Sequence, residues 1–97
     1  MTSFRILSDA SEELEAAVAY YNSQQQELGT AFLEEFENTV ERIVDLPLAA
    51  RVVRGNVRRK LIHRFPFFVL YRPGPDEVTI VAVAHRRRRP GYWVGRR

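Results

Sequence analysis

The sequence predicts an α+β fold in which a helical hairpin packs on one face of a mainly antiparallel sheet. Helical periodicity dominates the first half of the chain, extended apolar runs fill the second half, and the connections between those runs are short. Short connections join neighbouring antiparallel strands, so helices followed by clustered strands indicate α+β rather than alternating parallel units. We expect the order β-α-α-β-β-β in a single domain spanning residues 1–97, a length that allows one modest core.

The first strand and the first helix come from residues 4–26. Residues 4–7 form a short apolar run that suits a strand, and Asp9 and Glu12 have the spacing of a capping pair at a helix start. Apolar side chains then recur at helical spacing until about Gln26, at Ala10, Leu14, Ala17, Val18 and Tyr21. The acidic and glutamine side chains of this helix are expected to face solvent.

A second amphipathic helix follows the break at residues 28–30. Its apolar positions are Leu28, Phe32, Phe36, Val40, Ile43 and Leu46. The helix has to end before Pro47, because a proline disfavours helical geometry in the residue before it. Two helices joined so closely are expected to form an antiparallel hairpin.

The second half of the chain reads as a loop and three strands. Residues 47–56 contain proline and glycine without a clean period, which predicts a loop. Three strands follow, with turns between them, at about residues 57–64, 67–72 and 78–85. In the last run, alternation places Thr79, Val81, Val83 and His85 on one face and Val78, Ile80, Ala82 and Ala84 on the other. Because both faces are almost entirely apolar, we expect an interior strand.

The formal net charge of +3 conceals a separation of charge along the chain. Residues 1–46 carry ten acidic side chains and two arginines, whereas residues 47–97 carry thirteen basic and two acidic side chains. Such an asymmetry points to a polyanionic partner for the basic half.

Several classes of site are excluded by what the sequence lacks. The chain has no cysteine, which rules out disulfides and thiolate metal sites. It also has no membrane-length apolar run and no signal pattern, so we expect a cytoplasmic protein without contact to a membrane. No phosphate-binding glycine loop and no cluster with metal-ligand spacing is present, so we expect neither a metal nor a cofactor.

The groups that remain for chemistry are cationic and aromatic. The last strand ends at His85, and four arginines at positions 86–89 follow, with Tyr92 and Trp93 behind them. Guanidinium, imidazole and phenol groups neutralise phosphate and move protons, which suits cleavage by a 2′-hydroxyl attacking the adjacent phosphate. The alternatives are a solvated basic tail, a tail that packs through its aromatic residues, and a charged edge strand at residues 57–64.

The order of the elements and several short sequences resemble the RelE/ParE toxin superfamily over residues 4–93. The matching residues, in chain order, are Glu13, Tyr20-Tyr21, Leu28-Gly29 with Phe32-Leu33, Ile43 near Pro47, Arg58-Arg59, Phe65-Pro66-Phe67, Val69-Leu70-Tyr71-Arg72, and Val83-Ala84-His85 with Arg88, Pro90, Tyr92 and Trp93. The resemblance implies the toxin of a bacterial type II toxin-antitoxin module. Its expected partner is a cognate antitoxin, encoded by an adjacent gene, with which it forms a hetero-oligomer.

RelE-like members of the superfamily cleave messenger RNA in the ribosome. The resemblance places Arg58 and Lys60 at the two cationic strand positions of these nucleases, and Arg86 and Tyr92 at the two positions after the last strand. Phe68 stands where a further arginine is expected, and Arg64 is the candidate to replace it. The implied catalytic set is Arg58, Lys60, Arg86, Tyr92 and His85, and the implied nucleic-acid-binding set is Arg59, Arg64, Arg87, Arg88 and Arg89.

Either Tyr92 or His85 would act as acid or base in this interpretation. Tyr92 requires a lowered pKa for that role, and we expect the arginines at 86–89 to lower it.

ParE-like members instead inhibit DNA gyrase without a nuclease centre, and Phe68 and the helical hairpin fit them. A third interpretation is a toxin-like fold that has lost activity and only binds the antitoxin. The arginine run and Tyr92 favour RNA cleavage, so our main expectation is an mRNA endoribonuclease acting on the ribosome. Inhibition of gyrase is the alternative.

Overall fold

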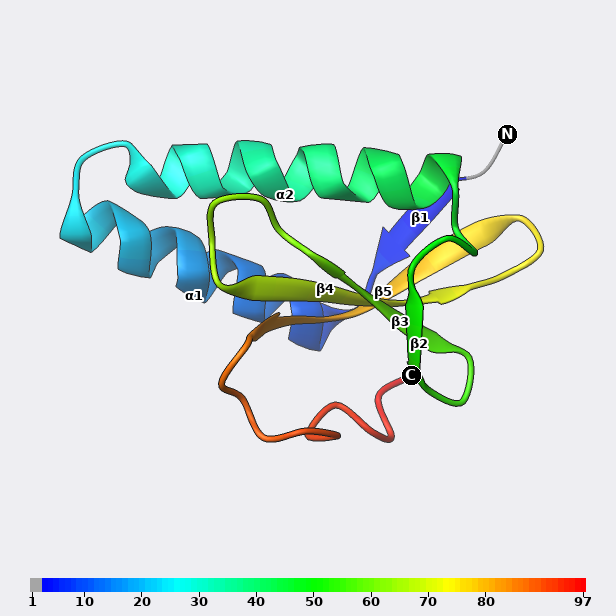
Figure 1. The fold of residues 1–97 in the computed structure, drawn as a ribbon. Coiled ribbons are helices and arrows are strands. Elements are labelled where there is room, and N and C mark those ends of the chain that lie inside the picture. Colours follow the sequence, from blue (N-terminus) through cyan, green and yellow to red (C-terminus); the bar gives the residue numbers. More distant parts are fainter. Residues whose placement is uncertain (1–2) are drawn as a thin grey trace.

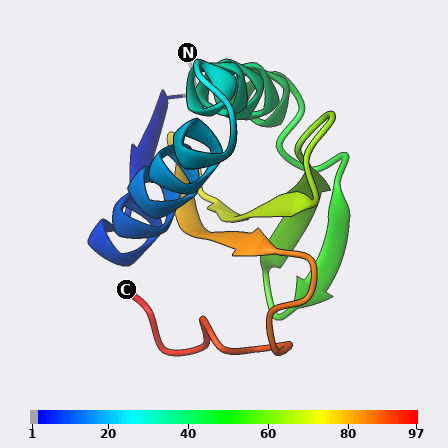
Figure 2. The same cartoon turned by 90° about the vertical axis from the view of Figure 1, so that its left-hand side faces the viewer.

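The computed structural model describes residues 3–97 and has three layers (Figure 1, Figure 2). Two helices form the first layer, a five-stranded sheet the second, and residues 86–97 run across the opposite face of the sheet as the third. The elements in chain order are β1 (Ser3–Ile6), α1 (Ser8–Gln24), α2 (Leu28–Asp45), β2 (Arg51–Arg54), β3 (Val57–Leu61), β4 (Phe67–Pro73) and β5 (Glu77–His85). The α+β fold class is confirmed.

The sheet has the strand order β1-β5-β4-β3-β2. Strands β2 to β5 form an antiparallel meander, and β1 adds in parallel to β5, which makes β5 an interior strand as expected. The predicted loop at residues 47–56 is wrong in part, because Arg51–Arg54 forms the edge strand β2. All four residues of β2 are exposed, so this strand has no apolar alternation for a sequence pattern to reveal.

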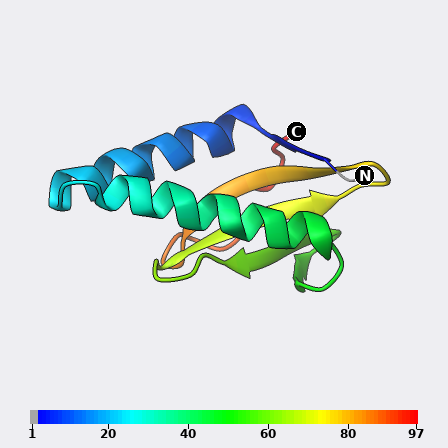
Figure 3. The ribbon, with the colours of Figure 1, turned by 90° about the horizontal axis from the view of Figure 1, so that it is seen from above.

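The two helices lie side by side and antiparallel (Figure 3). Gly29 is required where they meet, because a Cβ atom there would collide with the Val18 carbonyl oxygen. The Gly29 N–H donates a hydrogen bond of 2.7 Å to the Asn22 side chain, which closes the turn between the helices. In residues 3–97 neither helix is both long enough and apolar enough to cross a membrane.

The predicted capping pair at the start of α1 does not form. The helix begins at Ser8, its N-cap is Leu7, and no side chain caps it. Leu7 instead donates its N–H to the Ile80 carbonyl oxygen at 3.0 Å and accepts from the Ser11 N–H, because β1 continues directly into α1. The helix also ends at Gln24, two residues before the expected end.

Each face of the sheet has its own apolar core. The core under the helices includes the fully buried side chains of Phe32, Ile43, Ile62, Tyr71 and Ile80. The core under the third layer consists of Leu7, Val57, Leu70, Val81, Ala82, Ala84 and Trp93, with Phe68 and Tyr92 packed against it. The tail therefore packs through its aromatic residues and is not a solvated arm.

The expected alternation along β5 is broken by a β-bulge. Tyr71 pairs with Ile80 and the preceding Leu70 pairs with Ala82, so Val81 is an extra residue on β5. Ile80 and Val83 consequently face the helices, whereas Val81 and Ala82 belong to the core under the tail. A strict period of two had placed Ile80 and Ala82 on the same face, and that prediction is wrong.

Replacing Tyr71 by Phe should lower the free energy of unfolding by about 1 kcal/mol, because one buried hydrogen bond is lost. The Tyr71 hydroxyl donates to the Pro47 carbonyl oxygen at 2.8 Å and thereby anchors the connection between α2 and β2. Chemical denaturation measures the change. Tyr20→Phe, at a ring that is 58% exposed, is the matched control and should leave stability unchanged. Equal stability of the two variants would contradict the structural role of the Tyr71 hydroxyl.

Candidate functional site

A basic pocket lies between the β2–β3 hairpin and the segment that follows β5. It has a volume of about 290 Å³. Arg54 and Arg59 line it from the hairpin, and Arg86, Arg88 and Arg89 line it from the other side. Its apolar lining includes Phe68, Leu70, Ala84 and Trp93. We call these five arginines and this lining the basic pocket.

Two guanidinium groups of the basic pocket lie over aromatic rings, and none is paired with a carboxylate in residues 3–97. Arg59 lies over the Phe68 ring at 4.5 Å, and Arg88 lies over the Tyr92 ring at 4.0 Å. No acidic residue lines the pocket, and within residues 3–97 none of its five arginines forms an ion pair. The charge of the pocket is therefore not compensated by the described part of the chain.

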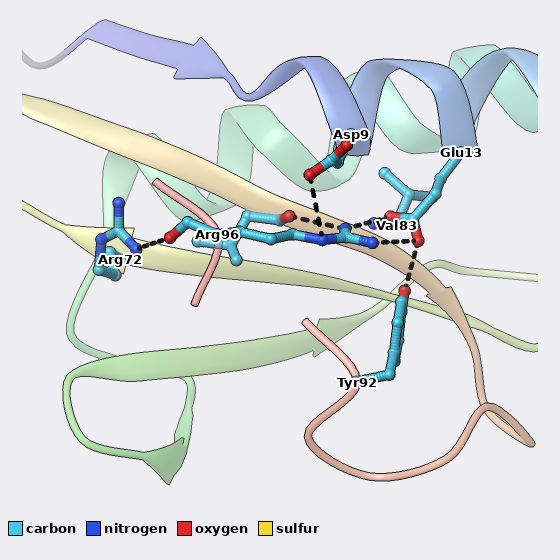
Figure 4. A network of polar contacts seen from close by, with 7 residues as sticks. Asp9, Glu13, Arg72, Val83, Tyr92 and Arg96 are labelled. Atoms are coloured by element: carbon cyan, nitrogen blue, oxygen red, sulfur yellow. Dashed lines mark hydrogen bonds and ion pairs between the residues drawn. The ribbon is translucent and has the colours of Figure 1, made fainter. Parts of the chain in front are cut away.

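The segment that forms one wall of the pocket is held in place by Glu13 of α1 (Figure 4). Glu13 Oε1 accepts hydrogen bonds from the Val83 N–H at 3.0 Å and from Arg96 at 2.8 Å. Glu13 Oε2 accepts from the Tyr92 hydroxyl at 2.7 Å and from Arg96 at 3.0 Å. One carboxylate thus joins the helix, strand β5 and two points of the tail.

The end of β1 explains why a charged pair is needed at this position. Within residues 3–97, the hydrogen bond from the Leu7 N–H to the Ile80 carbonyl oxygen is the last from the N-terminal segment to β5, and no strand covers that edge of β5 beyond it. The Val83 N–H and the Val81 carbonyl then require other partners. Glu13 accepts from Val83, and Arg96 donates to the Val81 carbonyl oxygen at 3.1 Å. The Glu13–Arg96 pair therefore replaces a missing strand.

The same network sets the pKa values of Glu13 and Tyr92. Burial raises the pKa of Glu13, but hydrogen bonds from Arg96, Tyr92 and the Val83 N–H outweigh it, and the net pKa lies below the ordinary value. Burial raises the pKa of Tyr92, and the hydrogen bond and charge of Glu13 raise it further. The expectation that the arginine run lowers the pKa of Tyr92 is wrong, because Arg88 and Arg96 contribute less than burial and Glu13.

The sheet separates the two cationic groups that the sequence placed in one site. Arg58 and Lys60 of β3 lie opposite Tyr71 and Val69 of β4, which belong to the core under the helices. Both cations are therefore on the helix side of the sheet. Arg58 donates to the carbonyl oxygens of Leu48 and Ala50 at 3.0 and 2.7 Å, and so holds the connection after α2. Lys60 lines a small cavity at the end of α2. Arg86 and Tyr92 border the pockets on the tail side.

His85 lies at the rim of the basic pocket. Its ring makes an edge contact with Phe67 at 5.2 Å, and its Nδ1 accepts a hydrogen bond of 3.1 Å from the Arg87 N–H. His85 also lines a second groove along α1, with Tyr20, Tyr21 and Tyr92. His85 thus lines both the basic pocket and the groove along α1.

Two of the expected nucleic-acid-binding residues lie outside the basic pocket. Arg64 sits in the turn after β3 at a φ of 74° and lies over the Phe65 ring at 5.4 Å. It does not cover Phe68, the place of the missing arginine, and Arg59 does so instead. The Arg87 side chain is exposed and does not line the pocket.

Sequence reasoning missed three residues that the structure makes important, namely Glu13, Arg54 and Arg96. Glu13 was assigned to the solvent face of its helix with the other acids, although its side chain is only 19% exposed. Arg54 was assigned to a loop. Its position near the pocket follows only from the pairing of β2 with β3. Within residues 3–97, no three His, Cys, Asp or Glu side chains converge as a metal site would require.

Comparison with known proteins gives a matching family and similar solved structures. Residues 4–90 match the family model described as the ParE toxin of the type II toxin-antitoxin system parDE. A solved structure of the chromosomal ParDE system of P. aeruginosa superposes with a TM-score of 0.78 at 20% identity, covering 88% of this chain and 96% of that one. At this identity the superposition establishes the fold alone. No curated protein matches the sequence.

Replacing Glu13 by Gln should lower the free energy of unfolding by about 2 kcal/mol, because Arg96 keeps its charge and loses its main partner. Urea denaturation measures the loss. Glu12→Gln changes an exposed neighbour on the same helix and should alter stability by less than about 0.5 kcal/mol. If Glu12→Gln lowers the free energy of unfolding as much as Glu13→Gln does, the Glu13–Arg96 pair does not anchor the tail.

The contribution of Glu13 should also depend on pH. Because the folded-state pKa of Glu13 is lowered, its stabilising effect is complete above its unfolded pKa and is lost as pH falls through the folded pKa. The stability difference between the wild type and Glu13→Gln should therefore be constant near neutral pH and shrink below about pH 4. Denaturation of both proteins across this range tests the sign. A difference that grows on acidification would contradict the lowered pKa.

Proposed function

Because the chain belongs to the ParE toxin family of type II toxin-antitoxin systems, we propose that it stops growth by inhibiting DNA gyrase and does not cleave RNA. It is the toxin of such a module, and a cognate antitoxin is its partner. Inhibition of gyrase is the activity that the resemblance to ParE-like toxins implies. The proposal treats residues 1–97 as one toxin domain that acts in the cytoplasm, where gyrase is found.

The observation that carries the proposal is the separation of the expected catalytic residues by the sheet. A ribonuclease of this kind has to bring its cations and its acid or base to a single phosphate. Arg58 and Lys60 instead face the helices, and Arg58 is bound to two backbone carbonyl groups. Residues held on opposite faces of a sheet do not act on one phosphate group.

The environment of Tyr92 supports the same conclusion. Its hydroxyl donates to Glu13, and its pKa lies above the ordinary tyrosine value. A phenol that stays protonated at neutral pH and is already bound to a carboxylate is a poor general base. Phe68, where an arginine is expected in RelE-like nucleases, binds no phosphate.

A second candidate function is cleavage of messenger RNA on the ribosome. It is favoured by the basic pocket, which brings Arg59 of the hairpin together with His85 and Arg86 at the end of β5. In this case His85 would be the acid or base, and Arg59, Arg86 and Arg88 would contact the phosphate. Arg58, Lys60 and Tyr92 would have no part in the chemistry.

The proposal also assigns the antitoxin a docking surface on the helical layer. A groove lined by Phe4, Leu14, Leu33 and Val44 runs between β1 and the two helices. Glu37, Glu41 and Asp45 stand along it. Such a groove suits an amphipathic segment with apolar anchors and flanking basic residues. Acidic residues elsewhere in the antitoxin would cover the basic pocket.

Purified toxin should block supercoiling by gyrase and leave ribosome-bound messenger RNA intact when the two assays are run in parallel. The control is the same preparation saturated with the antitoxin from the adjacent gene, which should restore supercoiling. Intact supercoiling with cut messenger RNA would replace the proposal by the second candidate, and Arg86→Ala should then slow cleavage. If neither assay responds and expression does not slow growth, the chain is an inactive partner of its antitoxin.

A further inference from the structure

We infer that the antitoxin adds an extended segment to the free edge of β5, in the groove that runs along α1. This groove is lined by Ala16 and Tyr20 of α1, by Val83 and His85 of β5 and by Arg88 of the tail, and we call it the edge groove. Its volume of about 540 Å³ lies within the range of ligand-binding clefts. The inference rests on the proposed function, in which the antitoxin is the partner, and gives that partner a second contact.

The first argument is the direction of the backbone groups at the end of β5. Val83 donates its N–H to Glu13, on the α1 side of the strand. The Arg86 N–H points the opposite way and donates to the Pro66 carbonyl oxygen, next to β4. Backbone groups alternate between the two edges of a strand, so the Val83 carbonyl and the His85 N–H also point toward α1. Strand β1 does not extend this far, and within residues 3–97 no strand covers this acceptor and this donor.

The space beside these backbone groups suits a polypeptide. A peptide that adds a strand to a sheet pairs with an acceptor and a donor spaced in this way along the edge. The helix wall of the edge groove carries only methyl groups at Ala16 and Ala17, which leaves room for a chain between α1 and β5. The edge groove therefore favours an extended segment of a protein.

The two faces of the sheet determine which side chains the segment has to carry, because side chains alternate along an extended chain. Toward the helices, the edge groove offers the ring of Tyr20, which is 58% exposed, and the ring of Phe67, which contacts His85 at 5.2 Å. Toward the tail, it offers Arg88, whose guanidinium lies over the Tyr92 ring at 4.0 Å. Within residues 3–97 no carboxylate pairs with Arg88. The complementary segment alternates apolar and acidic residues.

The position of the edge groove between two other surfaces favours the antitoxin as its occupant. Leu14 lines the acidic groove of the helical layer and Ala16 lines the edge groove, so α1 alone separates the two. A helix is about 10 Å across, and roughly five extended residues carry a chain around it. On the other side, His85, Arg88 and Tyr92 line both the edge groove and the basic pocket. One chain is thus able to run from the helical layer through the edge groove and bring its acidic residues to the pocket.

Hydrogen exchange of the backbone amides tests the strand addition directly. It is measured on the purified toxin and on its complex with the antitoxin from the adjacent gene. The His85 N–H should exchange at least about tenfold more slowly in the complex, because it becomes hydrogen-bonded to the added segment. The amides of β2, at the far edge of the sheet, serve as the control and should change by less than about threefold.

A variant that fills the edge groove provides the second measurement. Ala16→Trp should weaken antitoxin binding by about tenfold, and not abolish it, because the contact on the helical layer remains. Ala19→Trp is the matched control, since it places the same ring at an exposed residue of α1 outside the edge groove and the groove of the helical layer. This control should lose less than about threefold in affinity. Surface plasmon resonance with immobilised antitoxin measures both variants, and equal unfolding midpoints establish that both are folded.

Unchanged exchange of the His85 N–H, or equal affinities of the two tryptophan variants, would overturn the inference. Intact antitoxin binding by Ala16→Trp with loss of gyrase inhibition would also overturn it, because the edge groove would then belong to gyrase. Neither binding assay contains gyrase, so the inference and the proposed function fail separately. A toxin that blocks supercoiling without protection at His85 refutes the edge groove alone. A toxin that is protected at His85 but leaves supercoiling intact refutes the inhibition of gyrase alone.

Discussion

The carboxylate of Glu13 is the interaction on which the tail side of the molecule depends. It accepts four hydrogen bonds, from the Val83 N–H, from Tyr92 and twice from Arg96. These donors come from the edge of β5 and from two points of the tail, so one helix residue fixes both the strand and the segment that crosses it. Without this anchor the segment after β5 would keep the apolar contacts of Trp93 and the hydrogen bond from the Arg86 N–H to the Pro66 carbonyl oxygen, but it would lose its main link to α1. The basic pocket would then lack one defined wall, because three of its five arginines belong to that segment.

The three layers also determine where the two signs of charge lie. The acidic first half forms the helical layer, where Glu34, Glu37 and Glu41 of α2 are exposed. Five arginines of the second half line the basic pocket on the other side of the sheet, whereas Arg58 faces the helices. Pairing between the two halves neutralises few of these charges, since the ion pairs within residues 3–97 are Arg5–Glu77, Arg96–Asp9 and Arg96–Glu13. The sheet keeps the two charges apart, and each face can attract a partner of opposite charge.

The sequence predicts those helices and strands whose apolar residues follow a regular local spacing. Helix α2 has a clear apolar stripe, and the apolar runs of β4 and β5 are bounded by turns, so their limits were close to those observed. Strand β2 escaped prediction because it is exposed throughout. The bulge at Val81 was not predicted because the extra residue moves the following side chains of β5 to the other face of the sheet, while the run stays equally apolar. Arg58 and Lys60 were expected to act as cations, but the face of the sheet on which their side chains lie depends on how β3 pairs with β4. The role of Tyr92 depends on Glu13, 79 positions earlier in the chain, and no local pattern encodes that contact.

The parallel pairing of β1 with β5 has a consequence for the route by which the chain folds. Ser3 pairs with Glu77, and Glu13 reaches Arg96 across 83 positions, so both contacts close loops of almost the whole chain. Loop closure over such distances costs entropy before any contact repays it, and chains dominated by distant contacts fold slowly. The helical hairpin and the β2–β5 meander need only neighbouring residues and are able to form first. The edge of β5 and the tail are then expected to be completed last, so the pocket wall that carries Arg86, Arg88 and Arg89 forms after the hairpin wall that carries Arg54 and Arg59.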